Sequence, residues 1–187
     1  MKFIQNYKFL FLLLVIVFSC KLYKKDFDNP VDYNANDALD IRAPALVFYP
    51  KTQTINQNEV IKIESLVVFH PDSLESFTGL HFNVQFPNSL LELDTIKPGL
   101  FITDTSNSTP LFTYNYDGFN QIDIYAYFLS ETKLDIEGTG HIADIIFNSI
   151  SSGTDSIYYD LDDCQMIKIN DDEIQIMGKR GAEIIIQ

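Results

Sequence analysis

Hydrophobic and polar residues alternate along Phe77–Phe86, in the clearest pattern of the chain. Successive side chains of a strand point to opposite faces, so the alternation predicts a strand with one apolar and one polar side. The apolar side holds Leu80, Phe82, Val84 and Phe86, and the polar side holds His81, Asn83 and Gln85. The pattern is typical of an antiparallel sheet that covers a core and leaves its other face free. We expect Phe82 and Phe147 to be buried in that core.

The same alternation returns in Gln121–Leu129. Its apolar side holds Ile122, Ile124, Ala126 and Phe128, and its polar side holds Gln121, Asp123, Tyr125 and Tyr127. Tyr125 and Tyr127 are therefore expected to project from the sheet on the side away from the core.

Further short runs of β-branched and aromatic residues are separated by polar breaks, and a turn near Ser130–Asp135 is the only helical pattern. The other expected strands are Ala45–Tyr49, Val60–Phe69, Leu90–Ile96, Leu100–Thr103, Leu111–Tyr116, Gly140–Ile150, Ser156–Leu161, Met166–Ile169, Glu173–Met177 and Ala182–Ile186. Many short strands at this spacing predict an all-β sandwich or jelly roll.

The N-terminus has the pattern of an export signal. Phe9–Phe18 is an unbroken apolar run, too short to span a bilayer, which needs about 20 apolar residues. It ends in Val17-Phe18-Ser19-Cys20, which resembles a bacterial lipobox whose cysteine receives lipid. An ordinary cleaved signal with an incidental cysteine is the alternative.

These features divide the chain into a lipoprotein signal peptide (1–19), a polar flexible tether (20–43) and one β-sandwich domain (44–187). We therefore expect a lipid anchor on Cys20 that holds the protein in the cell envelope, at the outer membrane, with cell-surface exposure left open. The chain has two cysteines, so a lipidated Cys20 leaves Cys164 without a partner.

Metal and catalytic motifs are weak. Asp32, Asn34 and Asn36 have the spacing of a calcium loop, but Asp37 and Ala43 stand where that loop needs Gly and Glu. No histidine spacing predicts zinc, and no nucleophile triad or phosphate loop is present in the sequence. We expect no enzyme activity and no cofactor. The formal net charge of −13 argues against nucleic acid as a partner.

Four stretches together resemble the cohesin family, whose members bind dockerin domains in cellulose-degrading bacteria. They are FTGLHFNVQFPNSLLEL with DTIKPGLFI, then LFTYNYDGFNQIDIYAYF, then GTGHIADIIFNSISSGTDSIYY, and finally GAEIIIQ. The resemblance covers about Pro44–Gln187 and implies a nine-stranded jelly-roll β-sandwich.

The resemblance also implies a partner-binding face. One sheet face of cohesins binds dockerin, and the matching strands here carry His81, Asn83, Gln85, Tyr114, Tyr116, Asp123, Tyr125 and Tyr127. If the strand order is that of cohesins, His81, Asn83, Gln85, Tyr125 and Tyr127 form one patch. The expected function is protein docking, with a dockerin-bearing partner, in a polysaccharide-related assembly. A carbohydrate-binding module and a structural spacer are the alternatives, and the absence of tryptophan lowers the former.

Overall fold

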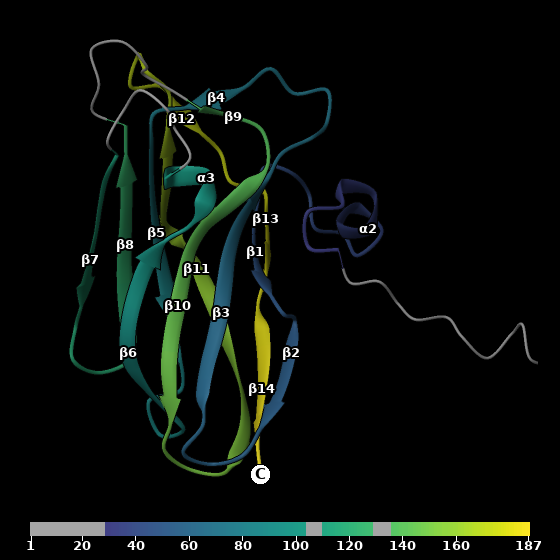
Figure 1. Cartoon of the computed structure of the whole chain (residues 1–187). Helices are drawn as coiled ribbons and strands as arrows, with labels where there is room; N and C mark the ends of the chain where they lie inside the picture. The colour runs from purple at the N-terminus through teal and green to yellow at the C-terminus, as the bar shows by residue number, and fades with distance from the viewer. Residues whose placement is uncertain (1–28, 104–109, 129–135) are drawn as a thin grey trace, which may run out of the picture.

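Two β-sheets pack face to face in the structure, a computed structural model that describes residues 29–103, 110–128 and 136–187 (Figure 1). The first sheet has the strand order β13-β1-β3-β10-β6. Its strands are β1 (Ala45–Tyr49), β3 (Val60–Val68), β6 (Leu91–Pro98), β10 (Gly140–Ser149) and β13 (Gly178–Arg180). All neighbours in it are antiparallel except β1 and β13, which are parallel.

The second sheet has the order β2-β14-β11-β5-β8-β7. Its strands are β2 (Thr52–Ile55), β5 (Gly79–Gln85), β7 (Leu111–Tyr116), β8 (Gln121–Tyr127), β11 (Gly153–Ile167) and β14 (Ala182–Ile186). The short strand β12 (Glu173–Ile174) pairs with β11, and β4 (Ser76–Phe77) pairs with β9 (Ile136–Glu137) at one end of the sandwich. Nine of the described strands are five residues or longer, which agrees with the predicted nine-stranded sandwich.

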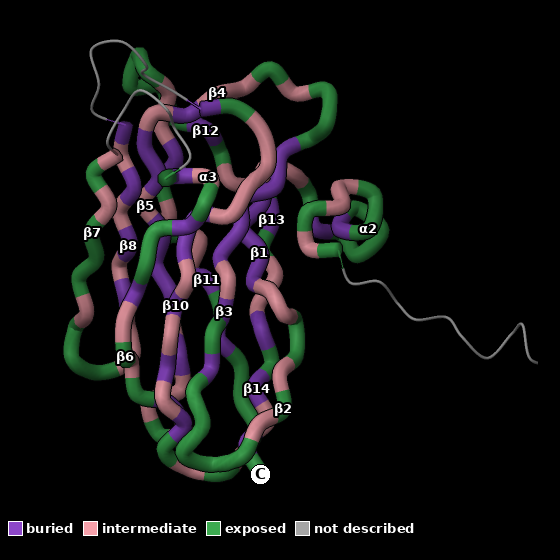
Figure 2. Tube along the Cα trace, viewed as in Figure 1, coloured by how far each residue is buried: buried purple, intermediate pink, exposed green. Residues whose placement is uncertain are grey.

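The core lies between the two sheets, where buried positions alternate along the strands (Figure 2). Phe82 and Phe147 are fully buried, as predicted. Tyr159 is also fully buried: its ring stacks on Phe48 at 3.9 Å between centroids, and its hydroxyl hydrogen-bonds the Ser65 hydroxyl at 2.9 Å. Burial raises the pKa of the Tyr159 phenol well above its ordinary value, so this group stays neutral.

Some predicted strands differ from the structure. Leu100–Thr103 is a helical turn, α3, because the amides of Ile102 and Thr103 both donate to the Gly99 carbonyl after β6 ends at Pro98. The two strands expected between Ser156 and Ile169 form one long strand, β11. The short strands β2 and β13 were not predicted, and the turn expected near 130–135 lies outside the described residues.

The second half of the expected tether has a defined conformation. Asp32 caps a short helix, α2 (Tyr33–Asp37), by accepting a hydrogen bond from the Ala35 amide at 3.1 Å. Asn36 is buried: its amide donates to the Pro30 carbonyl at 2.9 Å, and its oxygen accepts from Arg180 at 3.2 Å. These contacts are polar and follow no pattern of apolar residues, which is why the sequence did not predict this helix.

This N-terminal segment also covers apolar surface. Ile41 belongs to a small second cluster with Ala45, Val47, Leu66 and Val68. Ala45 and Val47 alternate with Leu46 and Phe48, which belong to the main core, so the second cluster lies on the outer side of the first sheet. The expected signal peptide and Cys20 precede the described residues. Within those residues no helix has the length and apolar character needed to cross a membrane.

Candidate functional site

The outer side of the second sheet carries a polar face on β5 and β8. We define the polar face as His81, Asn83, Gln85, Asp123, Tyr125 and Tyr127. The register pairs His81 with Tyr125, Asn83 with Asp123 and Gly79 with Tyr127, and directly paired residues of antiparallel strands share one side of the sheet. The structure therefore brings together the five side chains that were expected to form one patch.

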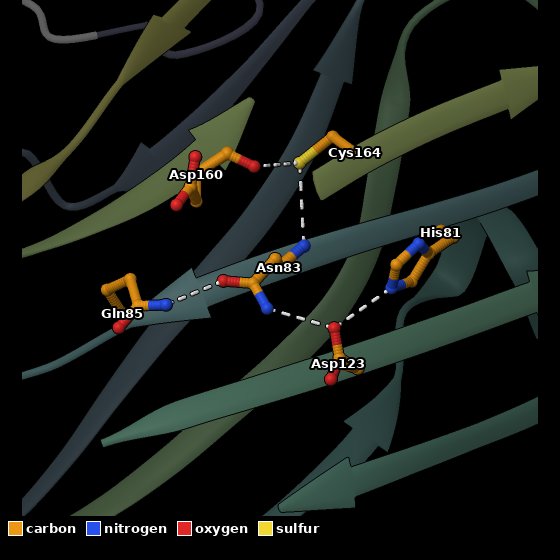
Figure 3. A network of polar contacts seen from close by, with 6 residues as sticks. All are labelled: His81, Asn83, Gln85, Asp123, Asp160 and Cys164. Atoms are coloured by element: carbon orange, nitrogen blue, oxygen red, sulfur yellow. Dashed lines mark hydrogen bonds and ion pairs between the residues drawn. The ribbon is translucent and has the colours of Figure 1, made fainter. Parts of the chain in front are cut away.

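Asn83 joins this face into a hydrogen-bonded network (Figure 3). Its amide nitrogen donates to Oδ1 of Asp123 at 2.9 Å, and its amide oxygen accepts from Nε2 of Gln85 at 2.9 Å. His81 Nε2 lies 3.0 Å from the same Asp123 oxygen. Asn83 is fully buried, although the alternation placed it on the polar side. The network makes this burial tolerable, because a buried amide is stable only when its donors and acceptors are paired.

Two contacts fix the tyrosines of the polar face. The rings of Tyr125 and His81 stack at 4.4 Å between centroids, with 7° between their planes. Burial, and then the charge of Asp123 and the Tyr127 phenol, raise the pKa of the Tyr125 hydroxyl. Tyr127 lies across Gly79, where a Cβ atom would come within 2.4 Å of its ring. Glycine at position 79 therefore makes room for the Tyr127 ring.

Tyr114 and Tyr116 are not part of this face, which corrects the prediction. Tyr114 pairs with Ile124 and Tyr116 pairs with Ile122, and both isoleucines point into the core. Both tyrosines thus lie on the inner side of the edge strand β7, and the Tyr116 ring packs against Phe86 at 6.0 Å between centroids. The aromatic residues of LFTYNY stand at alternate positions and so lie on one side of the strand. This signal would have placed them on the inner side.

The residues of β7 that do lie beside the polar face are Leu111, Thr113 and Asn115. They pair with Tyr127, Tyr125 and Asp123, respectively. Thr113 and Asn115 are exposed, and Leu111 is half exposed at 48%.

A bulge in β11 hollows the surface next to the polar face. The register shifts between Asp160, which pairs with Asn83, and Gln165, which pairs with His81, so β11 places extra residues opposite Phe82. The resulting pocket has a volume of about 440 Å³. It is lined by His81, Gln121, Asp123, Asp162, Asp163, Cys164, Gln165 and Glu173. Sequence alternation missed the β11 residues, because a bulge is a property of the pairing of two strands.

Cys164 has a structural position in this bulge. Its sulfur donates to the Asp160 carbonyl at 3.0 Å and accepts from the Asn83 amide N–H at 3.4 Å. Burial raises the pKa of the Cys164 thiol to about 11, so the reactive thiolate is scarce near neutral pH. The described residues contain no group of three or more His, Cys, Asp or Glu arranged to hold a metal ion.

Comparison with solved structures defines the class of fold. The cohesin–dockerin complex CaDoc0917–CaCohA2 contains a chain with a TM-score of 0.63 and 15% identity, covering 76% of this chain and 99% of that one. CaCohA2 comes from Clostridium acetobutylicum. The third cohesin of ScaC from Acetivibrio cellulolyticus, in complex with the ScaB dockerin, has a TM-score of 0.62 and 15% identity. That match covers 76% of this chain and 97% of the other. A chain of the Coh-OlpC–Doc435 complex of Clostridium thermocellum has a TM-score of 0.60 and 13% identity. That match covers 76% of this chain and 92% of the other.

These similarities show that the chain has a cohesin-like jelly-roll fold, as its sequence motifs indicated. No protein family model and no curated protein sequence matches the chain.

Proposed function

We propose that this protein is a non-catalytic docking module whose polar face binds a protein partner. The observation that carries the proposal is the stacked pair of Tyr125 and His81 beside an open pocket, on a fold whose solved examples include complexes with dockerins. Tyrosines that expose part of a ring amid polar groups supply contact area while their hydroxyl groups stay solvated. A dockerin-bearing protein in a polysaccharide-related assembly is the partner that this fold favours.

The charge of the pocket specifies the partner further. Asp123, Asp162, Asp163 and Glu173 line it, whereas no Lys or Arg among the described residues does. Asp162, Asp163 and Glu173 form no ion pair with another residue that the structure describes. A partner with Lys or Arg at the centre of its contact surface would supply the missing opposite charge, which speeds association and fixes orientation.

The N-terminus supports a place for this module in the cell. The short apolar run followed by Ser19-Cys20 favours lipid attachment at Cys20 and retention in the cell envelope, at the outer membrane. The segment from Lys21 onward then joins the anchor to the sandwich.

The test of docking is capture of a partner from secreted and envelope proteins of the source organism. We expect the wild type to retain a dockerin-bearing protein, identified by mass spectrometry, and Tyr125→Ala with Tyr127→Ala to lose it. Truncation of an interface anchor typically costs at least about 2 kcal/mol. Tyr114→Ala is the matched control, because Tyr114 is an exposed tyrosine on the other side of the sheet.

Two results would contradict the proposal. Equal capture by the wild type and the double variant would place the docking site elsewhere. Capture that does not weaken as salt is raised would contradict the electrostatic part, since exposed charge pairs are screened at a Debye length of about 8 Å at physiological salt.

A further inference from the structure

A second hollow lies at the end of β5, beside Tyr158, and Gln85 is the residue that it shares with the polar face. Its volume is about 290 Å³. It is lined by Gln85, Phe86, Pro87, Asn88, Ser89, Asn120, Asp155, Ser156 and Tyr158, and we call it the Tyr158 pocket. The volume is near the lower end of the range of about 300–1,000 Å³ typical of ligand pockets.

Tyr158 presents an aromatic ring that stacks on no other ring among the described residues. Its neighbours Ile157 and Tyr159 are fully buried, so Tyr158 points to the outer side of the sheet, where it is 48% exposed. It pairs with Gln85 across β11 and β5. Among the described residues no side chain stacks on the Tyr158 ring or hydrogen-bonds its hydroxyl. A ring in this position is free to pack against a ligand.

The side-chain amides of Asn88 and Asn120 likewise have no hydrogen-bond partner among the described residues, while main-chain hydrogen bonds fix the backbone at or beside each of them. The Phe86 amide donates to the Asn120 carbonyl at 3.0 Å, and the Leu90 amide donates to the Pro87 carbonyl at 3.0 Å. Neither Asn88 nor Asn120 forms a side-chain hydrogen bond with another residue that the structure describes. Each amide therefore offers one acceptor and two donor hydrogens to a ligand.

The lining decides the chemical class of that ligand. Among the described residues no Lys or Arg lines the pocket and Asp155 is its one charged residue, so an anionic ligand would be repelled. Amides and hydroxyls dominate the rest, which disfavours a purely apolar ligand, because these groups would lose their water without replacement. A pyranose sugar matches both features, since its ring has an apolar C–H face and an edge of hydroxyl groups.

We propose that the Tyr158 pocket binds a neutral oligosaccharide. One pyranose ring packs on the Tyr158 ring, and its hydroxyl groups hydrogen-bond the amides of Asn88 and Asn120. This activity is separate from docking through Tyr125 and Tyr127 and adds a carbohydrate contact to a protein-binding module.

The experiment titrates the full protein with cellohexaose, xylohexaose and mannohexaose and measures binding by calorimetry. We expect saturable binding of at least one of them, with a Kd of about 1 mM or tighter. Tyr158→Ala should weaken it about tenfold or more, because the stacking surface is lost. Tyr158→Phe should retain most of the affinity, and the exposed Tyr114→Ala control should retain all of it. Thermal melts verify that each variant is folded.

Three outcomes would overturn the proposal. The first is the absence of binding to all three sugars at about 10 mM, where a site with a Kd of 1 mM would be occupied. The second is equal sugar binding by the wild type and Tyr158→Ala, which would place the sugar elsewhere. The third is loss of protein capture by Tyr158→Ala without any sugar binding, which would make the pocket part of the docking surface.

Discussion

Asn83→Ala is the sharpest test of the polar face, because Asn83 is fully buried and connects the side chains around it. The substitution removes a hydrogen bond to the Asp123 carboxylate and one from the Gln85 amide, both 2.9 Å long. It leaves the Asn83 backbone contact with Cys164 in place.

The expected loss follows from these two bonds. A hydrogen bond to a charged group contributes about 1.5–3 kcal/mol and a neutral one about 0.5–1.5 kcal/mol. The Asp123 side chain is 20% exposed and Gln85 is half-buried, so water replaces part of what each loses. We therefore expect Asn83→Ala to lower the free energy of unfolding by about 2 kcal/mol, near the lower end of the combined range.

Urea unfolding measured by circular dichroism gives this quantity. The midpoint should fall while the slope with urea stays constant, because the surface exposed on unfolding hardly changes. Asn115→Ala is the matched control. Asn115 lies on β7, pairs with Asp123 across β7 and β8, and is exposed, so this substitution should change stability by less than about 0.5 kcal/mol. A loss below that value for Asn83→Ala would show that the network does not stabilise the fold.

Two substitutions and one measurement of thiol reactivity test other parts of the chain. Phe82→Ala should lower stability by about 3–5 kcal/mol in the same assay, and no loss would place Phe82 outside the core. Cys20→Ser should block lipid attachment, so a variant that fractionates with membranes like the wild type contradicts the anchor. In that variant Cys164, with a thiol pKa of about 11, should react with iodoacetamide at pH 8 about 100-fold slower when folded than when unfolded. Its rate should rise with pH as thiolate forms, and equal rates would refute its burial.

Alternation was enough to predict which side of β5 and β8 faces the core. It placed Phe82 and Ile124 inside and His81 and Tyr125 outside, because each of these strands has a covered and an uncovered face. The resemblance to cohesins supplied what alternation lacks, namely that β5 and β8 are neighbours.

Alternation did not predict how exposed a residue is where neighbouring strands decide it. Tyr114 is half exposed although it lies on the inner side of the sheet, because β7 is an edge strand. Asn83 is buried although it lies on the outer side, because the bulge of β11 brings Cys164 against its backbone. Neither the exposure of Tyr114 nor the burial of Asn83 can be read from the type of residue and its position in the alternation.

The buried position of Asn83 links the stability of the sheet to the shape of its outer surface. One amide holds the Asp123 carboxylate and the Gln85 side chain, Asp123 lies within 3.0 Å of His81, and His81 stacks on Tyr125. Each of these side chains has lost rotamer freedom before any partner arrives, so a partner need not offset the roughly 0.5–1.5 kcal/mol that ordering each of them would cost. The contacts that stabilise the fold therefore also preorganise the polar face for the docking that we propose.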